Sequence, residues 1–129
     1  MANLIQAIIV REDLDLPRGL LTAQVAHIHM ETIRQLTRDE KEIPPIIKDW
    51  LKSPYIHVHS VPNKEWYHLF LSKAQNSKEL CSSWFDTLYL SIDGGKSRTP
   101  FQNVEVGFSI GPCDADKIKA IIGDLPFLK

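Results

Sequence analysis

The sequence predicts a small α/β protein in which one mixed four-stranded sheet is sandwiched between helices. Short apolar runs of the kind that form strands alternate with stretches of helical periodicity, in the order β-α-α-β-α-β-β-α. The 129 residues are enough to bury one core, so we expect a single domain over residues 1–129. Hydrophobic residues at 43% and charged residues at 24% are ordinary for a globular chain, so disorder is not expected.

The bulk composition bounds the function. A formal net charge of −1 gives no overall attraction to nucleic acid, so RNA binding would depend on a local basic patch. Cys81 and Cys113 have neither a metal-binding nor a disulfide-framework spacing, and we expect them to be core residues or bystanders. The first residues lack a signal-peptide pattern, and no apolar run approaches the roughly 20 residues of a membrane helix. We therefore expect a protein of the reducing cytoplasm, away from membranes.

The first half of the chain predicts a buried strand followed by a long helix. The run LIQAIIVR, from Leu4 to Arg11, is apolar and rich in β-branched residues, which suggests a strand buried on both faces. From about Leu20 to Thr37, hydrophobic residues recur at helical spacing. The stripe expected to face the core consists of Leu21, Val25, Ile28, Thr32 and Leu36. A neighbouring row, which shares one surface of the helix, consists of Leu20, Gln24, His27 and Glu31.

The rest of the chain supplies the other strands and helices. The last two strands are joined by a short connection that suits an antiparallel pair, and Gly111-Pro112 is expected to stop the second of them. In chain order we expect a helix over 45–52, a strand over 55–61, a helix from a cap at Asn63 to about Lys73, a helical turn over 78–85, strands over 87–93 and 104–110, and a helix from Asp114 or Asp116 to about Ile122.

The first candidate site is the junction between the first strand and the first helix, RGLLTAQVAHI. It follows a strand directly, and open α/β sheets usually bind ligands at the carboxyl ends of their strands. Gln24 offers an amide that both donates and accepts hydrogen bonds, and His27 can take or give a proton near neutral pH. The alternative is that both belong to the partly exposed polar row of an amphipathic helix.

The second candidate site is the segment DGGKSRTP, which also follows a strand. Gly94-Gly95 permits backbone conformations that bring amide groups close to an anion. Asp93 adds a carboxylate and Ser97 a hydroxyl, while Lys96 and Arg98 add positive charge. The alternative is a flexible turn between two strands.

The two segments would meet if the first and third strands were neighbours that run in the same direction. The cations expected at that edge of the sheet would then form a local basic patch for a phosphate or two: Arg11, Arg18, Lys96 and Arg98. This step depends on the strand order. No metal site is expected, because His57 and His59 share a strand face but lack a third ligand at a convincing spacing.

Several segments resemble the archaeal and eukaryotic-type peptidyl-tRNA hydrolases. IIVREDLDLPRGLLTAQVAHI is similar to that family's opening, in which an Arg-x-Asp-Leu turn precedes a GKGK-like loop and then AAQCSHA. WLKSP resembles the family's WLRSG, DGGKSR its DAGRTQ and VGFSIGP its VLGIGP, and IIGDLPFL follows a comparable Gly-x-Leu ending. The residues that match in the opening segment are Arg11, Asp13, Leu14, Gly19, Ala23, Gln24 and His27.

The resemblance implies a mixed sheet between helices, often in a homodimer, and hydrolysis of the ester that joins a peptide to the terminal ribose of tRNA. It implies no metal or organic cofactor. Asp93, directly or through Ser97, would orient or activate the attacking water, and nearby cations or amides would stabilise the oxyanion. The catalytic candidates are His27, Asp93, Ser97 and Gln24, and those for tRNA binding are Arg11, Arg18, Lys96, Arg98, Gly94 and Gly95.

Three positions depart from the family pattern. Leu20 stands where the last lysine of the GKGK loop would fall, Ala26 replaces the serine before the histidine, and Arg98 replaces the glutamine of DAGRTQ. A second interpretation is therefore a relative that binds tRNA or another phosphate-bearing ligand without turnover. A third is a hydrolase or transferase that acts on a different substrate in the same cleft.

Overall fold

The computed structural model describes residues 4–38, 42–91 and 98–128. Within these ranges it confirms the mixed α/β class and the predicted order of strands and helices, with a short 3-10 helix added after the first strand. The elements are β1 (Leu4–Arg11), η1 (Glu12–Leu14), α1 (Arg18–Leu36), α2 (Pro45–Lys52), β2 (Ile56–Val61), α3 (Lys64–Asn76), β3 (Cys81–Ser91), β4 (Arg98–Asp114) and α4 (Ala115–Ile122).

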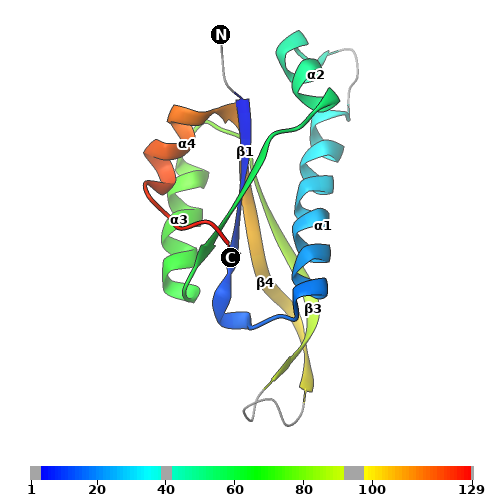
Figure 1. Cartoon of the computed structure of the whole chain (residues 1–129), viewed down its shortest axis with the longest axis vertical. Coiled ribbons are helices and arrows are strands. Elements are labelled where there is room, and N and C mark those ends of the chain that lie inside the picture. Colours follow the sequence, from blue (N-terminus) through cyan, green and yellow to red (C-terminus); the bar gives the residue numbers. More distant parts are fainter. Residues whose placement is uncertain (1–3, 39–41, 92–97, 129) are drawn as a thin grey trace.

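The four strands form one sheet in the order β2-β1-β4-β3. β1 runs parallel to β2 and antiparallel to β4, and β4 runs antiparallel to β3. α1 covers one face of the sheet, whereas α3 and α4 cover the other (Figure 1). The first and third strands therefore run in the same direction, but they are not neighbours, because β4 lies between them.

β1 is buried on both faces because side chains alternate along a strand. On the α3 and α4 face, Ile5, Ala7 and Ile9 join the larger core cluster. On the α1 face, Ile8 and Val10 pack against Ile28 of the predicted helical stripe, with Leu21 and Val25 beside them. The continuous apolar run of β1 is thus explained by its central position between two layers of helices.

A buried polar network attaches α1 to the sheet. Gln6 of β1 is fully buried, and its Nε2 donates to Thr32 Oγ1 at 2.9 Å. Thr32 Oγ1 in turn lies 2.9 Å from Ser109 Oγ of β4. His29 Nδ1 lies 2.6 Å from Gln6 Oε1, and the imidazole is the donor of this bond because a carbonyl oxygen can only accept. These directional bonds fix the rotation of α1 about its own axis and so determine which of its residues face β3.

Two local predictions are wrong. The segment 78–85 was expected to form a helical turn, but β3 begins at Cys81, and Cys81 to Trp84 pair with Ile110 to Gly107 of β4. Pairing with a distant strand outweighs the local helical preference there. Gly111-Pro112 does not stop β4 either: the peptide bond between them is cis, and the strand continues to Asp114. Its last residues pair with the start of β1, through Ile5 and Cys113.

The predicted helix cap at Asn63 is confirmed, and Asp114, which was expected only near the start of the last helix, is also a cap. Asn63 accepts a hydrogen bond from the backbone N–H of Trp66, and Asp114 accepts one from that of Asp116. Such a side chain satisfies a backbone donor that the first turn of a helix leaves without an internal partner. These short-range signals, unlike the strand bounds, depend only on residues close together in the chain.

β3 and β4 form an arm that projects beyond the rest of the sheet. Gly107 lies between Val10 of β1 and Trp84 of β3, close to the end of β1. From there the antiparallel pair continues to Ser91 and Arg98. At roughly 3.3 Å per residue, the described part of the arm extends about 20 Å past this point. Figure 1 shows the arm reaching below the start of α1.

His59 attaches the end of the chain to β2, and its burial predicts a pH dependence. Its Nδ1 lies 3.0 Å from the carbonyl oxygen of Leu125, its ring stacks on Phe127, and burial lowers its pKa. The unfolded chain therefore binds more protons than the folded one below about pH 6.5, so stability should fall as the pH drops through this range. We expect His59→Gln to lose less stability than the wild type between pH 7.5 and pH 5. Urea unfolding of both proteins measures this, and equal losses would contradict it.

Candidate active site

The amide of Gln24 is held by two side chains of β3. Trp84 Nε1 donates to Gln24 Oε1 at 2.7 Å, and Gln24 Nε2 donates to Asp86 Oδ2 at 2.9 Å. Trp84 and Asp86 lie two residues apart on one strand, so both point toward the face that α1 covers. Gln24 is only 3% exposed. Both ends of its amide are therefore engaged inside the protein, and its orientation is fixed.

His27 follows Gln24 by one turn of α1 and lies at the same place. Its ring meets that of Trp84 edge-on, with 5.1 Å between the centroids, and its side chain is exposed. A groove of about 420 Å³ opens beside the two rings. The structure thus brings together the two predicted residues of the helical row, Gln24 and His27, and adds Trp84 and Asp86 to them.

Asp86 is the candidate that sequence reasoning missed. It lies at the boundary between the expected helical turn and the expected strand, where neither assignment gave its side chain a direction. The sequence nevertheless contained a signal. Every second residue from Ser82 onward has a side chain that suits the face covered by α1: Ser82, Trp84, Asp86 and Leu88. Ser82 Oγ donates to Gln35 Oε1 of α1 at 3.1 Å. Leu88, two residues after Asp86, is buried. If the strand had been predicted to begin at Ser82, the alternation of side chains would have placed that of Asp86 on the face covered by α1.

Leu20 packs into the apolar base of this site. It lies against a cluster formed by Leu14 of η1, Leu88 of β3 and Val106 of β4, and Trp84 borders the same cluster. Leu20 therefore holds the start of α1 against the arm instead of carrying a charge toward Asp86. The position at which the resemblance implies a lysine is apolar in contacts as well as in sequence.

Positive potential is still present at the start of α1. Pro17 is the N-cap residue, with no side-chain hydrogen bond, and the first turn contains no acidic residue. The N–H groups of a first helical turn lack partners within the helix and carry a partial positive charge. The exposed Arg18 adds a full charge there and lines a second groove, of about 580 Å³, between α1 and the end of the chain. This helix end is suited to a negatively charged group.

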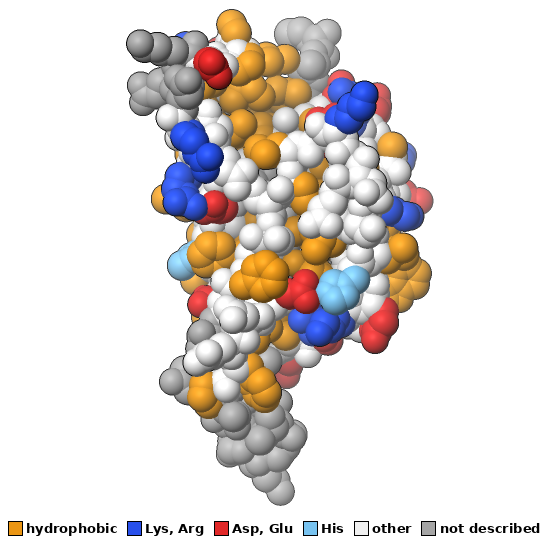
Figure 2. Space-filling view, turned by 180° about the vertical axis from the view of Figure 1, so that it is seen from behind, with side chains coloured by type: hydrophobic (Ala, Val, Ile, Leu, Met, Phe, Trp, Pro, Cys, Tyr) orange, Lys and Arg blue, Asp and Glu red, His pale blue; other side chains and the backbone are white. Residues whose placement is uncertain are grey.

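The other predicted cations do not all join Arg18. Arg11 lies in the layer that α3 covers: it forms a bidentate pair with Asp13, and its Nη1 donates to the carbonyl oxygen of Glu105. The pair with Asp13 raises the pKa of Arg11. Figure 2 shows that, on the side of the molecule seen from behind, Lys and Arg side chains mostly lie beside Asp and Glu rather than in one basic patch.

The predicted loop candidates lie outside the described residues: Asp93, Gly94, Gly95, Lys96 and Ser97. Arg98 is described only as the first residue of β4, where it pairs with Ser91. Their assignment to the site stays a prediction. Within the described ranges, no three His, Cys, Asp or Glu side chains lie close enough together to hold a metal ion.

The cysteines are not activated as nucleophiles. Cys113 is buried and Cys81 is partly buried, and neither forms a disulfide. Burial raises the pKa of Cys81 to about 11 and that of Cys113 to about 12, so both remain thiols at neutral pH. Over the described part of the chain, no helix is both long enough and apolar enough to span a membrane.

The fold and this arrangement define an α/β protein whose candidate site lies between the first helix and the third strand of a mixed sheet. The chain belongs to the peptidyl-tRNA hydrolase PTH2 family, whose model matches residues 4–128. The match covers both candidate segments and all the strands and helices, and it supports a function of the peptidyl-tRNA hydrolase kind. No curated protein sequence matches the chain significantly.

Proposed function

We propose that this protein hydrolyses the ester bond between a peptide, or an N-blocked aminoacyl group, and the terminal ribose of tRNA. The match to the PTH2 family over residues 4–128 carries the proposal. The Trp84–Gln24–Asp86 arrangement beside His27 supports it, because it provides a carboxylate held by Gln24 and, next to Trp84, an exposed imidazole that lines a groove.

In the proposed mechanism, water attacks the ester carbonyl. Asp86, oriented by Gln24, accepts a proton from the water as the new carbon–oxygen bond forms. The partial positive charge at the start of α1 favours the negative charge of the tetrahedral oxyanion, and Arg18, which lines the second groove, is assigned to tRNA binding. The carbon–oxygen bond to the ribose then breaks, and the ribose oxygen takes a proton from His27. The sequence-based assignment gives the task of Asp86 to Asp93, acting directly or through Ser97, and the two carboxylates are distinguished by experiment.

The test is the release of an N-acetylated amino acid from N-acetyl-aminoacyl-tRNA by the purified protein. We expect release above the buffer rate, and a loss of about a hundredfold for His27→Ala, which removes the proposed acid. His57→Ala is the matched control, because it removes a histidine on β2, outside the candidate site, and we expect it to keep the rate. Absence of release by the wild type, or an unchanged rate in His27→Ala, would contradict the proposed function.

A second function, binding without turnover, is favoured by one observation: the apolar packing of Leu20 at the position of the family lysine. It predicts salt-sensitive binding of tRNA through Arg18, Lys96 and Arg98, without release of the amino acid. Reversing the charge of Arg18 and Arg98 together should abolish this binding. Binding that survives the reversal would exclude this function, and turnover would leave the first one standing.

The family resemblance also implies a homodimer, and the cysteine pattern and N-terminal sequence favour the cytoplasm; we keep both as proposals. Sedimentation at several protein concentrations tests the first, with a species of twice the 14.7 kDa chain mass expected. Fractionation of cells that express the tagged chain tests the second.

A further inference from the structure

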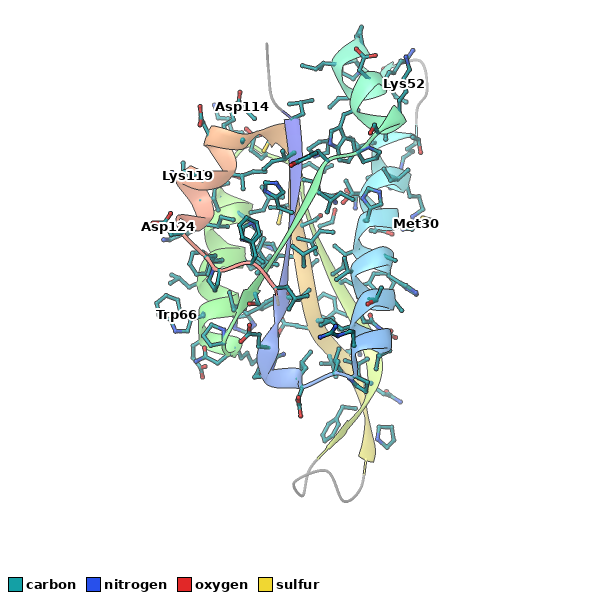
Figure 3. The ribbon with its side chains drawn as sticks, viewed as in Figure 1. Met30, Lys52, Trp66, Asp114, Lys119 and Asp124 are labelled. Atoms are coloured by element: carbon teal, nitrogen blue, oxygen red, sulfur yellow. The ribbon has the colours of Figure 1, made fainter. Side chains whose placement is uncertain are left out.

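The surface of the groove beside His27 is mainly apolar. It is lined along α1 by Ala26, Met30 and Ile33, and on the β3 side by Trp84. Met30 is 65% exposed, and Figure 3 shows it on the side of α1 that points away from β1. Contact between such a side chain and water is unfavourable, and an apolar ligand that covered it would remove this cost.

The charges at the groove neutralise each other. Arg34 donates to both carboxylate oxygens of Glu31, at 2.6 and 2.7 Å from Nη2 and 3.1 Å from Nε. The pair has no net charge, so this part of the groove attracts a phosphate less strongly than an uncompensated cation of the kind on which RNA binding depends. The Trp84 Nε1 donor is also occupied, by Gln24. The groove thus provides mainly contact with carbon atoms.

The groove adjoins the candidate active site. His27 and Trp84 belong to both: Trp84 orients Gln24 within the site, and the rings of His27 and Trp84, which meet edge-on, both line the groove. A group bound in the groove would therefore lie next to His27, the proposed acid. In peptidyl-tRNA, one neighbour of the scissile ester that needs no phosphate contact is the side chain of the esterified amino acid.

We propose that this groove binds an apolar side chain of the peptide, or of the N-blocked aminoacyl group, and so sets a preference among substrates. The inference rests on the proposed function, since it concerns the acyl part of the same ester. A volume of about 420 Å³ is large enough for one aromatic or branched side chain. Met30 is unbranched and flexible, so it adapts to apolar groups of different shape, and the preference is graded rather than absolute.

The first experiment measures binding without catalysis. The chain contains two methionines, Met1 and Met30, so labelling their methyl groups with ¹³C gives two signals, and Met30→Leu identifies the one in the groove. We expect N-acetyl-phenylalaninamide to shift the Met30 signal, and N-acetyl-serinamide at the same concentration to leave it in place. A Met30 signal that moves with neither amide, or that moves only with adenosine 5′-monophosphate, would overturn the proposal.

The second experiment measures specificity. With N-acetyl-phenylalanyl and N-acetyl-seryl esters of one tRNA, we expect kcat/KM to favour the phenylalanyl ester about tenfold. Met30→Lys should remove most of this preference, whereas Met30→Leu should keep it. Leu69→Lys is the matched control, since Leu69 is 45% exposed on α3, on the opposite face of the sheet, and its variant should behave as the wild type.

The two proposals fail in different ways. If neither ester is hydrolysed but the Met30 signal shifts with the phenylalanine amide alone, the proposed function fails and the groove remains a site for apolar acylated amino acids. If both esters are hydrolysed with equal kcat/KM by the wild type and by Met30→Lys, the proposed function stands and the inference about the groove is wrong.

Discussion

Asp86→Asn is expected to lower the rate of peptidyl-tRNA hydrolysis by about a hundredfold or more, because the asparagine cannot accept the proton of the attacking water. The substitution keeps the size of the side chain. It also keeps an oxygen that can accept the hydrogen bond from Gln24 Nε2, which lies 2.9 Å from the carboxylate in the wild type. The fold should therefore be preserved. Single-turnover release from N-acetyl-aminoacyl-tRNA measures the rate, and urea unfolding checks that stability is unchanged.

Asp93→Asn is the matched comparison, because it makes the same chemical change at the carboxylate that the family resemblance favours. If Asp86 accepts the proton, Asp86→Asn loses the rate and Asp93→Asn keeps most of it. The reverse pattern would assign the role to Asp93 and leave Asp86 as a residue that orients Gln24. Equal and complete activity in both variants would refute a carboxylate mechanism at either position.

The candidate site could be predicted from sequence only where its residues lie close together in the chain. Gln24 and His27 share a helical surface by spacing alone, and this pairing is confirmed by their common contacts with Trp84. The bond between Gln24 and Asp86 joins residues 62 positions apart. Its existence depends on the orientation of α1 relative to β3, which local periodicity does not determine.

The same distinction between local and long-range contacts explains which parts of the fold could be predicted from sequence. β1 and α2 were predicted with their observed bounds, because an apolar β-branched run and a proline at a helix start are local signals. The start of β3 and both ends of β4 were missed, and β4 begins at Arg98 rather than at Val104. The start of β3 and the end of β4 depend on pairing with a strand that is distant in sequence. The hydrogen-bond network of Gln6, Thr32 and Ser109 could not be predicted for the same reason, because its members are distant in sequence. This network nevertheless fixes the orientation of α1, the helix that carries Gln24 and His27.

Gly107→Ala is expected to destabilise the fold by about 2–3 kcal/mol, because there is no room for a Cβ at Gly107 between β1 and Ile28 of α1. An added Cβ would lie 2.6 Å from the carbonyl oxygen of Ile9 and 2.9 Å from Cδ1 of Ile28. The Ile28 side chain can rotate, but the Ile9 carbonyl belongs to the central strand and cannot move without disturbing the β1–β4 pairing. The midpoint and slope of urea unfolding measure the loss.

Gly19→Ala is the control, because Gly19 lies in the first turn of α1 and a Cβ there meets nothing within 4 Å. Alanine favours the helical conformation over glycine, so this variant should be as stable as the wild type or up to about 1 kcal/mol more stable. Gly107 also pairs with Trp84 of β3, which holds Gln24 of α1. Gly107→Ala should therefore displace Gln24 and His27 relative to β3. We expect this displacement to lower the hydrolysis rate even where the protein remains folded. A stable Gly107→Ala variant with full activity would show that the distance between α1 and the sheet does not control the site.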